Sequence, residues 1–378
     1  MVRSTHATPR AGRGRLVVLN WRDCWHPEGG GSELYVTEVA RRLAAEGRPV
    51  TVLTARYPGA ARTEVREGLR YVRRGGHLTV YLWAALLLAL GRLGPLGRVE
   101  QVLEVQNGMP FLARLFTRAR VTVLVHHVHR EQWSILAAPL ARFGWFMESR
   151  VAPRVNRGCR YVAVSDVTRT ELAELGVRAA DITLAFNGTP PVPPFEQRPE
   201  STAPQLVMLV RLVPHKRVEH AMHAVAALRA RHPGLHLTVM GSGWWHDELL
   251  AERDRLDLAE AVTFLGHVEE RTKFEVLSGA WVHLLPSVKE GWGLSIVEAA
   301  HVGVPSVAYA DAGGVRESIL DGVTGLLALD LPDLVAQVDR LLTDHGLRHE
   351  LGEKAKVRAV GFTWEATATT VAGVLDAG

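Results

Sequence analysis

Two glutamates eight positions apart, Glu290 and Glu298, flank a Gly-Trp-Gly turn in the stretch KEGWGLSIVEA at 289–299. A carboxylate accepts hydrogen bonds in pairs, so each glutamate could hold two vicinal hydroxyls of a ligand. The stretch also fits a purely structural pattern, because Ser295 and Glu298 have the spacing of a capping box at a helix start. The turn alone leaves both interpretations open.

Two cations follow another apolar run. Arg211 comes directly after the run LVMLV at 206–210, and Lys216 lies five residues later. Arginine offers a planar fork to phosphate oxygens, and lysine a mobile point charge. Cations at a helix start interact unfavourably with the positive end of the helix dipole. A bound diphosphate would interact favourably with both the cations and the dipole. With the two glutamates, this pattern suits a nucleotide sugar, with one carboxylate on the sugar, the other on the ribose, and the diphosphate between them.

Glycines and histidines follow two further apolar runs. The loop Gly29–Gly31 could cradle a phosphate, but it lacks the G-x-G-x-x-G pattern and the later acidic residue of a dinucleotide site. His126, His127 and His129 invite a metal interpretation. On one strand end they cannot all converge easily, and no acidic or cysteine partner follows at a ligand spacing. We therefore expect no metal there, and one active-site histidine among neighbours with structural or solvent-facing roles.

The elements that must position these residues alternate along the chain. Short apolar runs that suit buried parallel strands are separated by helical patterns throughout. The predicted strands are 16–20, 50–54, 121–125, 161–164, 206–210, 235–240, 262–265, 282–285, 305–308 and 324–327. This alternation predicts an α/β fold of two doubly wound, Rossmann-like domains, which bind ligands at the carboxyl ends of their strands.

A proline-rich stretch divides the chain, with six prolines in residues 189–204. Neither a helix nor an inner strand tolerates that density, so we interpret it as a linker. The predicted parts are a flexible arm at 1–14, an N-terminal acceptor-side domain at 15–188, the linker at 189–204, a C-terminal nucleotide-sugar-binding domain at 205–361, and a helix at 362–378.

Charge is divided at nearly the same place. Residues 1–190 hold 27 arginines, no lysine and 15 acidic residues, a balance of +12, and the remainder carries −8, which together give the overall +4. Such a basic half suggests an anionic partner or surface.

The most apolar run, Leu78–Leu90, is shorter than the roughly 20 residues of a bilayer span. We read it as a buried helix, with a role at a membrane surface left open. No secretory signal opens the sequence, and Cys24 and Cys159 are expected to be free thiols in a reducing compartment.

The ordered set of motifs resembles a retaining glycosyltransferase of family 4 with the GT-B fold. The resemblance rests on GGGSE at 29–33, His126, VAVS at 162–165, Asn187-Gly188, RLVPHK at 211–216, GSG at 241–243, Glu290 with Glu298, and Gly313-Gly314. These motifs occur in order and span roughly residues 15–370. The segment that begins Phe362-Thr363-Trp364 resembles the helix that returns to the first domain in this family.

The resemblance implies a role for each of these positions. His126 and Glu290 would be catalytic. The donor diphosphate would contact Arg211, Lys216, Gly30, Gly31, Gly293 and Leu294, and the donor sugar would contact Glu290, Gly291, Trp292 and Gly293. Glu298, Gly241 and Val268 would contact the ribose and nucleoside. Such enzymes need no metal and no cofactor, since the nucleoside-diphosphate sugar is a co-substrate.

Three positions depart from the family pattern. Trp292 stands where phenylalanine is usual, and His215 and Arg217 flank Lys216 where glutamate and glycine are usual. The phosphate end of the site is therefore expected to be more cationic, and the sugar pocket reshaped.

The expected function is transfer of a sugar to a hydroxyl of a cell-envelope glycolipid, a polysaccharide or a secondary metabolite. The expected location is the cytoplasm, with peripheral contact to the anionic inner face of the membrane. A sugar-nucleotide epimerase, or another nucleotide-sugar-binding protein of this fold, is the alternative. A phosphorylase lacks a strong candidate for a cofactor lysine, and the scattered arginines include no nucleic-acid recognition motif.

Overall fold

A computed structural model describes residues 14–133 and 138–377. The chain divides into two compact units, each described here by itself. Unit 1 comprises Met1–Gly188 and Trp364–Gly378, and unit 2 comprises Thr189–Thr363. Among the described residues, every helix is too short or too polar to cross a bilayer.

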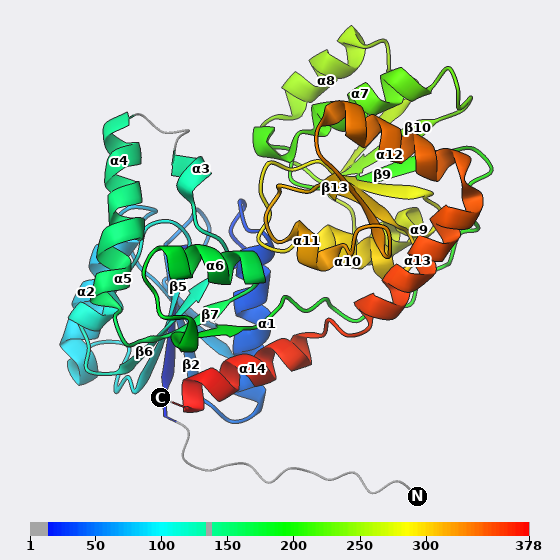
Figure 1. Cartoon of the computed structure of the whole chain (residues 1–378). Coiled ribbons are helices and arrows are strands. Elements are labelled where there is room, and N and C mark those ends of the chain that lie inside the picture. The colour runs from blue at the N-terminus through cyan, green and yellow to red at the C-terminus, as the bar shows by residue number, and fades with distance from the viewer. Residues whose placement is uncertain (1–13, 134–137, 378) are drawn as a thin grey trace, which may run out of the picture. The chain divides into compact units, whose positions relative to one another are not determined.

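Unit 1 contains an eight-stranded sheet in the order β3-β4-β2-β1-β5-β6-β7-β8 (Figure 1). Its pairs are parallel except for the antiparallel hairpin of β3 and β4. The strands are β1 Leu16–Leu19, β2 Val50–Thr54, β3 Thr63–Arg66, β4 Leu69–Arg73, β5 Gln101–Gln106, β6 Arg120–Val125, β7 Arg160–Ala163 and β8 Ile182–Leu184. The helices are α1 Gly31–Ala45, α2 Val80–Leu90, α3 Arg130–Trp133, α4 Ala138–Phe146, α5 Ala152–Val155, α6 Asp166–Glu174 and α14 Trp364–Asp376. Short helical turns are η1 Gly91–Leu93, η2 Ala113–Leu115, η3 Met147–Val151 and η4 Ala179–Asp181.

The two faces of this sheet carry different helices. Leu16 and Val18 of β1 join a core cluster with residues of α1 and α14, whereas Val17 and Leu19 join a second cluster with residues of α2. Successive strand side chains point to opposite faces, so α1 with α14 and α2 cover opposite sides of the sheet. This arrangement leaves the carboxyl ends of the strands to the loops that carry the predicted site residues.

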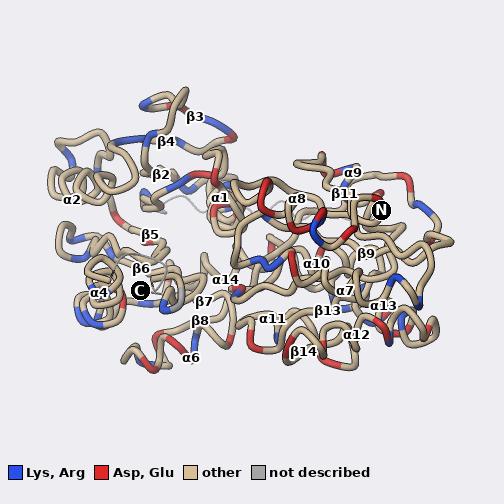
Figure 2. The backbone as a smooth tube through the Cα atoms, turned by 90° about the horizontal axis from the view of Figure 1, so that it is seen from above, with Lys and Arg blue, Asp and Glu red and all other residues tan. Residues whose placement is uncertain are grey.

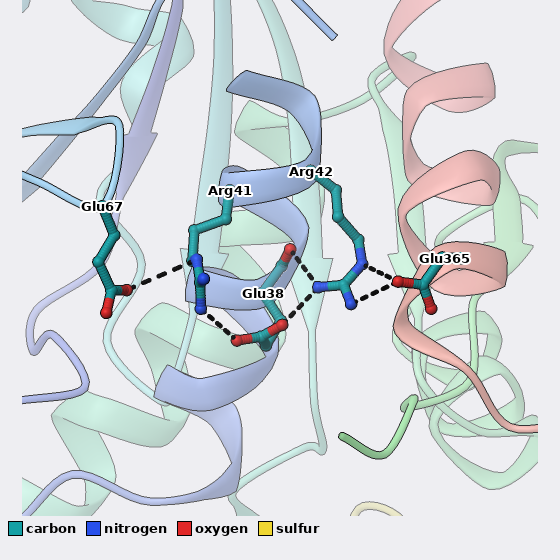
Figure 3. A network of polar contacts seen from close by, with 5 residues as sticks. All are labelled: Glu38, Arg41, Arg42, Glu67 and Glu365. Atoms are coloured by element: carbon teal, nitrogen blue, oxygen red, sulfur yellow. Dashed lines mark hydrogen bonds and ion pairs between the residues drawn. The ribbon is translucent and has the colours of Figure 1, made fainter. Parts of the chain in front are cut away.

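The C-terminal helix α14 is held on unit 1 mainly by apolar packing. Trp364 is completely buried, and its ring lies edge-on to Tyr35 of α1 at 5.7 Å between centroids. An ion-pair network on the outer side of α1 adds contacts to α14 and to the β3–β4 turn (Figure 3). Its members are Glu38, Arg41, Arg42, Glu67 and Glu365. Such exposed pairs contribute up to about 1 kcal/mol each, so the buried tryptophan is the stronger anchor.

Unit 2 contains a six-stranded, all-parallel sheet in the order β11-β10-β9-β12-β13-β14. The strands are β9 Gln205–Leu209, β10 His236–Met240, β11 Val262–Gly266, β12 Val282–Leu285, β13 Ser306–Tyr309 and β14 Gly325–Ala328. The helices are α7 Val218–Leu228, α8 His246–Arg255, α9 Glu270–Ser278, α10 Leu294–His301, α11 Val315–Ser318, α12 Leu331–Thr343 and α13 His345–Ala359, and η5 is Pro214–Lys216. Helices α7 and α12 pack on one face of the sheet, and α9 and α10 on the other.

The proline-rich stretch belongs to unit 2 and packs against it, unlike a free linker. Val192 and Phe195 contact the core cluster that includes Phe274. Ser201 donates its amide N–H to the Gly279 carbonyl at 3.1 Å, and the Trp281 indole donates to the Ser201 carbonyl at 2.8 Å. Prolines prevent regular secondary structure there, but they do not prevent the segment from lying on the body of the unit.

The apolar run Leu78–Leu90 differs from its prediction in a way that matters for function. It forms α2, but only one side of the helix is buried, through residues such as Ala84 and Leu88. Leu82 and Leu86 are 71% and 48% exposed, so the prediction of a buried helix is wrong for half of its surface.

Candidate functional site

The Gly-Trp-Gly turn lies at the carboxyl edge of the unit 2 sheet, between the end of β12 and the start of α10. Glu290 is fixed by its backbone, which donates to the Ala312 carbonyl at 2.9 Å and accepts from the Gly314 N–H at 3.0 Å. Gly313 has φ +73°, and a Cβ there would lie 2.7 Å from the Glu290 carbonyl oxygen. Glycine is therefore required where the loop after β13 meets the turn.

Lys216 and Glu290 meet at this edge. The lysine ammonium forms an ion pair with the Glu290 carboxylate, and both side chains are mostly buried, at 15% and 13% exposure. Their loops are also joined through the backbone, because Val288 donates to the His215 carbonyl at 2.8 Å. Burial, together with the neighbouring Lys216 charge, lowers the pKa of His215 to about 4. The imidazole is therefore neutral near pH 7, so the expectation that His215 makes this end of the site more cationic is wrong. The positive charge near His215 is that of Lys216 and Arg211.

The backbone of the Gly-Ser-Gly turn after β10 packs closely against the backbone of the loop that carries Arg211. A Cβ at Gly241, where φ is +129°, would lie 1.8 Å from the Val210 carbonyl oxygen. A Cβ at Gly243 would lie 2.1 Å from the Leu212 carbonyl oxygen. Only glycine fits at both positions, and this close approach places the turn beside the exposed Arg211.

Glu298 has a partner that the sequence interpretation missed. Its carboxylate accepts a hydrogen bond at 2.7 Å from the ammonium of Lys273 on α9, which also contacts Glu270 at 2.8 Å. Lys273 is only 5% exposed. Burial opposes its charge, but Glu298 and Glu270 together raise the pKa of Lys273, so it stays protonated. The only sequence signal was the Glu270-to-Lys273 spacing of an ordinary surface pair on a helix.

The capping-box alternative is excluded. Helix α10 begins at Leu294, and its N-cap is Gly293, with φ +89° and no side-chain cap hydrogen bond. Ser295 therefore lies inside the helix, and the Glu298 carboxylate points to Lys273 and not to the start of its own helix.

Four other residues assigned to the donor differ in how far they are exposed. The sequence predicts that Trp292 contacts the sugar, but its indole is 2% exposed and lies edge-on to Phe362 at 5.0 Å. Its ring therefore offers no surface to a ligand in this structure. Val268 is half-buried and packs against the cluster that contains Met240 and Phe274. Leu294, like Gly291, is half-buried at the turn.

His126 lies in unit 1, directly after β6. It is 5% exposed, and its ring meets Tyr35 edge-on at 5.1 Å between centroids. Burial lowers the pKa of His126 to about 3, so the imidazole is neutral in ordinary buffers. Its Nε2 has no hydrogen-bond partner among the described residues. A buried, unpaired ring nitrogen is suited to a hydrogen bond with a ligand hydroxyl.

The neighbouring histidines do not join His126. His127 stacks on His129 at 4.1 Å, and His129 lies 3.2 Å from the Glu148 carboxylate, which also accepts from the Trp133 indole. Glu148 thus ties this loop to η3 and α3, which gives His129 a structural role.

The glycine loop of unit 1 is already hydrogen-bonded. Gly30 is the N-cap of α1, and its N–H donates to the Glu33 carboxylate at 2.8 Å. Glu33 is also paired with Arg22 at 3.2 Å. A phosphate could therefore use the Gly30 N–H only by displacing Glu33, whereas Gly31 is the first, exposed residue of the helix.

The Lys273 contact leads to a testable expectation. If Glu298 binds the nucleoside, as the resemblance implies, Lys273→Met should weaken nucleoside diphosphate binding, because Glu298 would lose the cation that orients its carboxylate. The change should also lower the melting temperature. Titration calorimetry and thermal unfolding separate the two effects. Lys273→Arg, which keeps the charge, should recover most of the binding. If binding is unchanged while the melting temperature falls, Lys273 has only a structural role.

Comparisons with known proteins give the family. A model described as glycosyl transferases group 1 matches residues 194–358, and a model described as glycosyltransferase family 4 matches residues 29–192. Glycogen synthase from Mycobacterium tuberculosis (strain H37Rv) is 33% identical over 210 residues, which are 54% of this chain and 50% of that protein. The match thus spans about half of the length of that relative.

Solved structures agree on the fold. Sucrose-phosphate synthase from Thermosynechococcus elongatus superimposes with a TM-score of 0.78 at 19% identity, covering 96% of this chain and 98% of that one. Anabaena HepE in complex with UDP-glucose gives 0.74 at 17% identity, covering 97% and 100%. Both units have their counterparts in these proteins, and the chain belongs to the family 4-type glycosyltransferases with the GT-B fold.

Proposed function

We propose that the protein transfers a sugar from a nucleoside-diphosphate sugar to a hydroxyl acceptor, with retention of the anomeric configuration. The observation that carries the proposal is the grouping of Lys216, Glu290 and the start of α10 at one edge of the unit 2 sheet. The HepE structure contains UDP-glucose, which makes uridine donors the first to test. The acceptor class is a cell-envelope glycolipid, a polysaccharide or a secondary metabolite.

The proposed roles follow from charge and position. Lys216 and Arg211 offset the charge of the diphosphate, and the amides at Gly293 and Leu294 add the favourable end of a helix dipole. Glu298, oriented by Lys273, accepts hydrogen bonds from the ribose hydroxyls. Glu290 contacts the donor sugar once the diphosphate has drawn Lys216 away from it. His126 is the unit 1 group that we assign to the sugar, through its neutral Nε2.

Two cations at the diphosphate also make a metal unnecessary for the reaction that we propose. A divalent ion stabilises the charge of a leaving diphosphate, and here Arg211 and Lys216 would supply that stabilisation. The chemistry left to the protein is orientation of the sugar and charge stabilisation as the bond to the diphosphate breaks.

The direct test is an assay with a panel of nucleoside-diphosphate sugars and hydroxyl acceptors, with and without excess chelator. We expect a glycosylated product that keeps the donor's anomeric configuration by NMR, at a rate that chelator does not change. Loss of activity with chelator, restored by magnesium or manganese, would contradict the metal-independent mechanism. Release of an epimerised sugar without any glycosylated product would favour the epimerase alternative.

We further propose that the protein works in the cytoplasm, in peripheral contact with an anionic membrane. Unit 1 has an exposed apolar strip on α2 and the two short helical turns η1 and η2. Its members are Leu82, Leu86, Leu90, Leu93, Leu115 and Phe116. Beside the strip is a surface hollow of about 1200 Å³ that five exposed arginines line. They are Arg92, Arg98, Arg114, Arg118 and Arg120.

Apolar side chains beside arginines match the two parts of a membrane interface, the acyl boundary and the anionic headgroups. Figure 2 shows basic residues, here all arginines, on the segments around α2 and α4. Phe143 and Phe146 of α4 are 52% and 54% exposed. Phe111, at 4%, does pack in the core.

Liposome sedimentation tests this contact. The protein should bind vesicles that contain anionic lipid, bind neutral vesicles weakly, and dissociate at high salt, because screening shortens the reach of surface charges. Arg92→Ala with Arg118→Ala should weaken binding about 30-fold, since each arginine near the leaflet contributes about 1 kcal/mol. Leu93→Asp should also weaken it, whereas Leu329→Asp, at a leucine of unit 2 that is 78% exposed against 92% for Leu93, is the matched control. Equal, negligible binding to both kinds of vesicle would favour a soluble acceptor.

A further inference from the structure

Three side chains with metal-ligating atoms gather on unit 2, at a place that has no part in the donor site. His345 and His349 lie one turn apart at the start of α13, and Glu200 lies in the proline-rich segment before β9. Their ligand atoms all lie within 4.8 Å of one another, and this is the only such group among the residues that the structure describes.

Two of the three distances within the group are close to those between ligands of one metal ion. The Glu200 Oε2 atom lies 3.6 Å from His345 Nε2 and 3.4 Å from His349 Nε2. Ligands about 2.0–2.1 Å from a tetrahedral zinc ion lie roughly 3.4 Å from each other. Both separations exceed the 2.7–3.2 Å of an ordinary N–H···O hydrogen bond. His349 Nε2 is at the outer limit of a hydrogen bond to this oxygen, whereas His345 Nε2 lies beyond that limit. A shared ion would account for both separations.

The carboxylate is held in place from behind. Its other oxygen, Oε1, accepts a hydrogen bond at 2.9 Å from Nε of Arg348. Arg348 is only 2% exposed, donates through Nη1 to the Leu341 carbonyl at 2.8 Å, and lies over the Trp281 ring at 4.0 Å. This buried arginine orients the carboxylate with Oε2 toward the histidines. Groups that hydrogen-bond to metal ligands orient them in the same way in known metal sites.

We propose that Glu200, His345 and His349 bind a transition metal ion of the zinc class, with water in the fourth position. Two imidazoles and one carboxylate form a common zinc ligand set, and histidines at i and i+4 face the same side of a helix. The ion would join the segment before β9 to the start of α13. Because Glu200 precedes β9 and α12 returns from the end of β14, the site lies at the amino-terminal edge of the sheet, opposite the donor residues.

The proposed role of the ion is structural: it stabilises the folded state of unit 2 and takes no part in glycosyl transfer. An ion that binds the folded state alone raises its stability with increasing concentration of the ion. Excess zinc should therefore raise the melting temperature of the metal-free protein, and should leave the rate of sugar transfer at temperatures well below melting unchanged.

The test uses tag-free protein that has been stripped of metal, titrated with zinc by calorimetry and with cobalt(II) by visible absorption. We expect one equivalent to bind, with the absorption of a tetrahedral cobalt site. His349→Ala and Glu200→Gln should each lower the affinity at least tenfold and abolish the cobalt signal. His267→Ala, which removes an exposed histidine elsewhere in unit 2, should change neither. Absence of binding, or binding that both ligand variants retain, would overturn the proposal.

Discussion

Replacing Lys216 with methionine is expected to lower the affinity for a nucleoside diphosphate by about tenfold to a hundredfold. The lysine forms a mostly buried ion pair with Glu290 in the structure, and we propose that it turns to the diphosphate when the donor binds. Loss of one hydrogen bond to a charged group costs about 1.5–3 kcal/mol, which is the source of this range. The variant also leaves the Glu290 carboxylate without its counter-ion beside the phosphate, which adds repulsion.

The matched control is Lys354→Met. Lys354 also forms an ion pair, with Glu350 on the exposed side of α13, so its removal changes the net charge equally. Titration calorimetry of both variants with uridine diphosphate should show a large loss for Lys216→Met and little change for Lys354→Met. Equal effects would mean that overall charge, and not a specific contact, governs binding.

Acid should unfold unit 2 in a way that depends on His283. This histidine of β12 is completely buried, with Nδ1 2.9 Å from the Ser306 hydroxyl, and burial lowers its pKa to about 3. The unfolded chain takes up a proton near the ordinary histidine pKa of about 6.5. The contribution that neutral His283 makes to the free energy of unfolding is therefore fully present above about pH 6.5. It is lost as the pH falls toward the folded pKa, at up to about 1.4 kcal/mol per unit.

His283→Gln should reduce this acid sensitivity, although it lowers stability at neutral pH by disturbing a packed site. Denaturant unfolding at pH 7.5 and 5.0 gives the free energy of unfolding at each pH. The difference between these two values should be smaller for the variant by about 1–2 kcal/mol. His246→Gln changes a side chain that is 42% exposed, unlike the buried His283, and serves as the control. An unchanged pH difference in His283→Gln would contradict the assignment.

The parallel strands were the part of the fold that periodicity predicted well, because both faces of their sheets are covered. The run Val50–Thr54 forms β2 with the predicted bounds, and Val282–Leu285 likewise forms β12. Strands β3, β4, β5 and β8 were not predicted. The β5 sequence QVLEVQ includes three polar residues that are all buried, so it does not form an apolar run. Glu104 is tolerated there because it accepts three backbone N–H bonds at 2.9–3.0 Å, from residues 111–113. These contacts come from the loop that follows the strand, and the alternation of apolar and polar residues within the strand does not reveal them.

The donor-site residues divide in the same way. Gly293 and Gly313 can be recognised as turn residues from the sequence, because both adopt the positive φ angles that glycine tolerates best. The burial of Trp292 against Phe362 could not be foreseen, since the two residues lie 70 positions apart and the partner is set by tertiary packing. Lys273 was missed for the same reason. Its spacing to Glu270 describes a surface pair, and only the packing of α9 on α10 buries it beside Glu298.

The central claim is that the turn between β12 and α10 binds the donor, with Glu298 on the ribose and Glu290 on the sugar. It is tested most directly by titrating Glu290→Gln and Glu298→Gln with the nucleoside diphosphate and measuring turnover with the complete donor. Glu298→Gln should weaken diphosphate binding by about tenfold to a hundredfold. Glu290→Gln should keep that binding and lose most of its turnover. Loss of diphosphate binding in Glu290→Gln together with unchanged binding in Glu298→Gln would contradict the account.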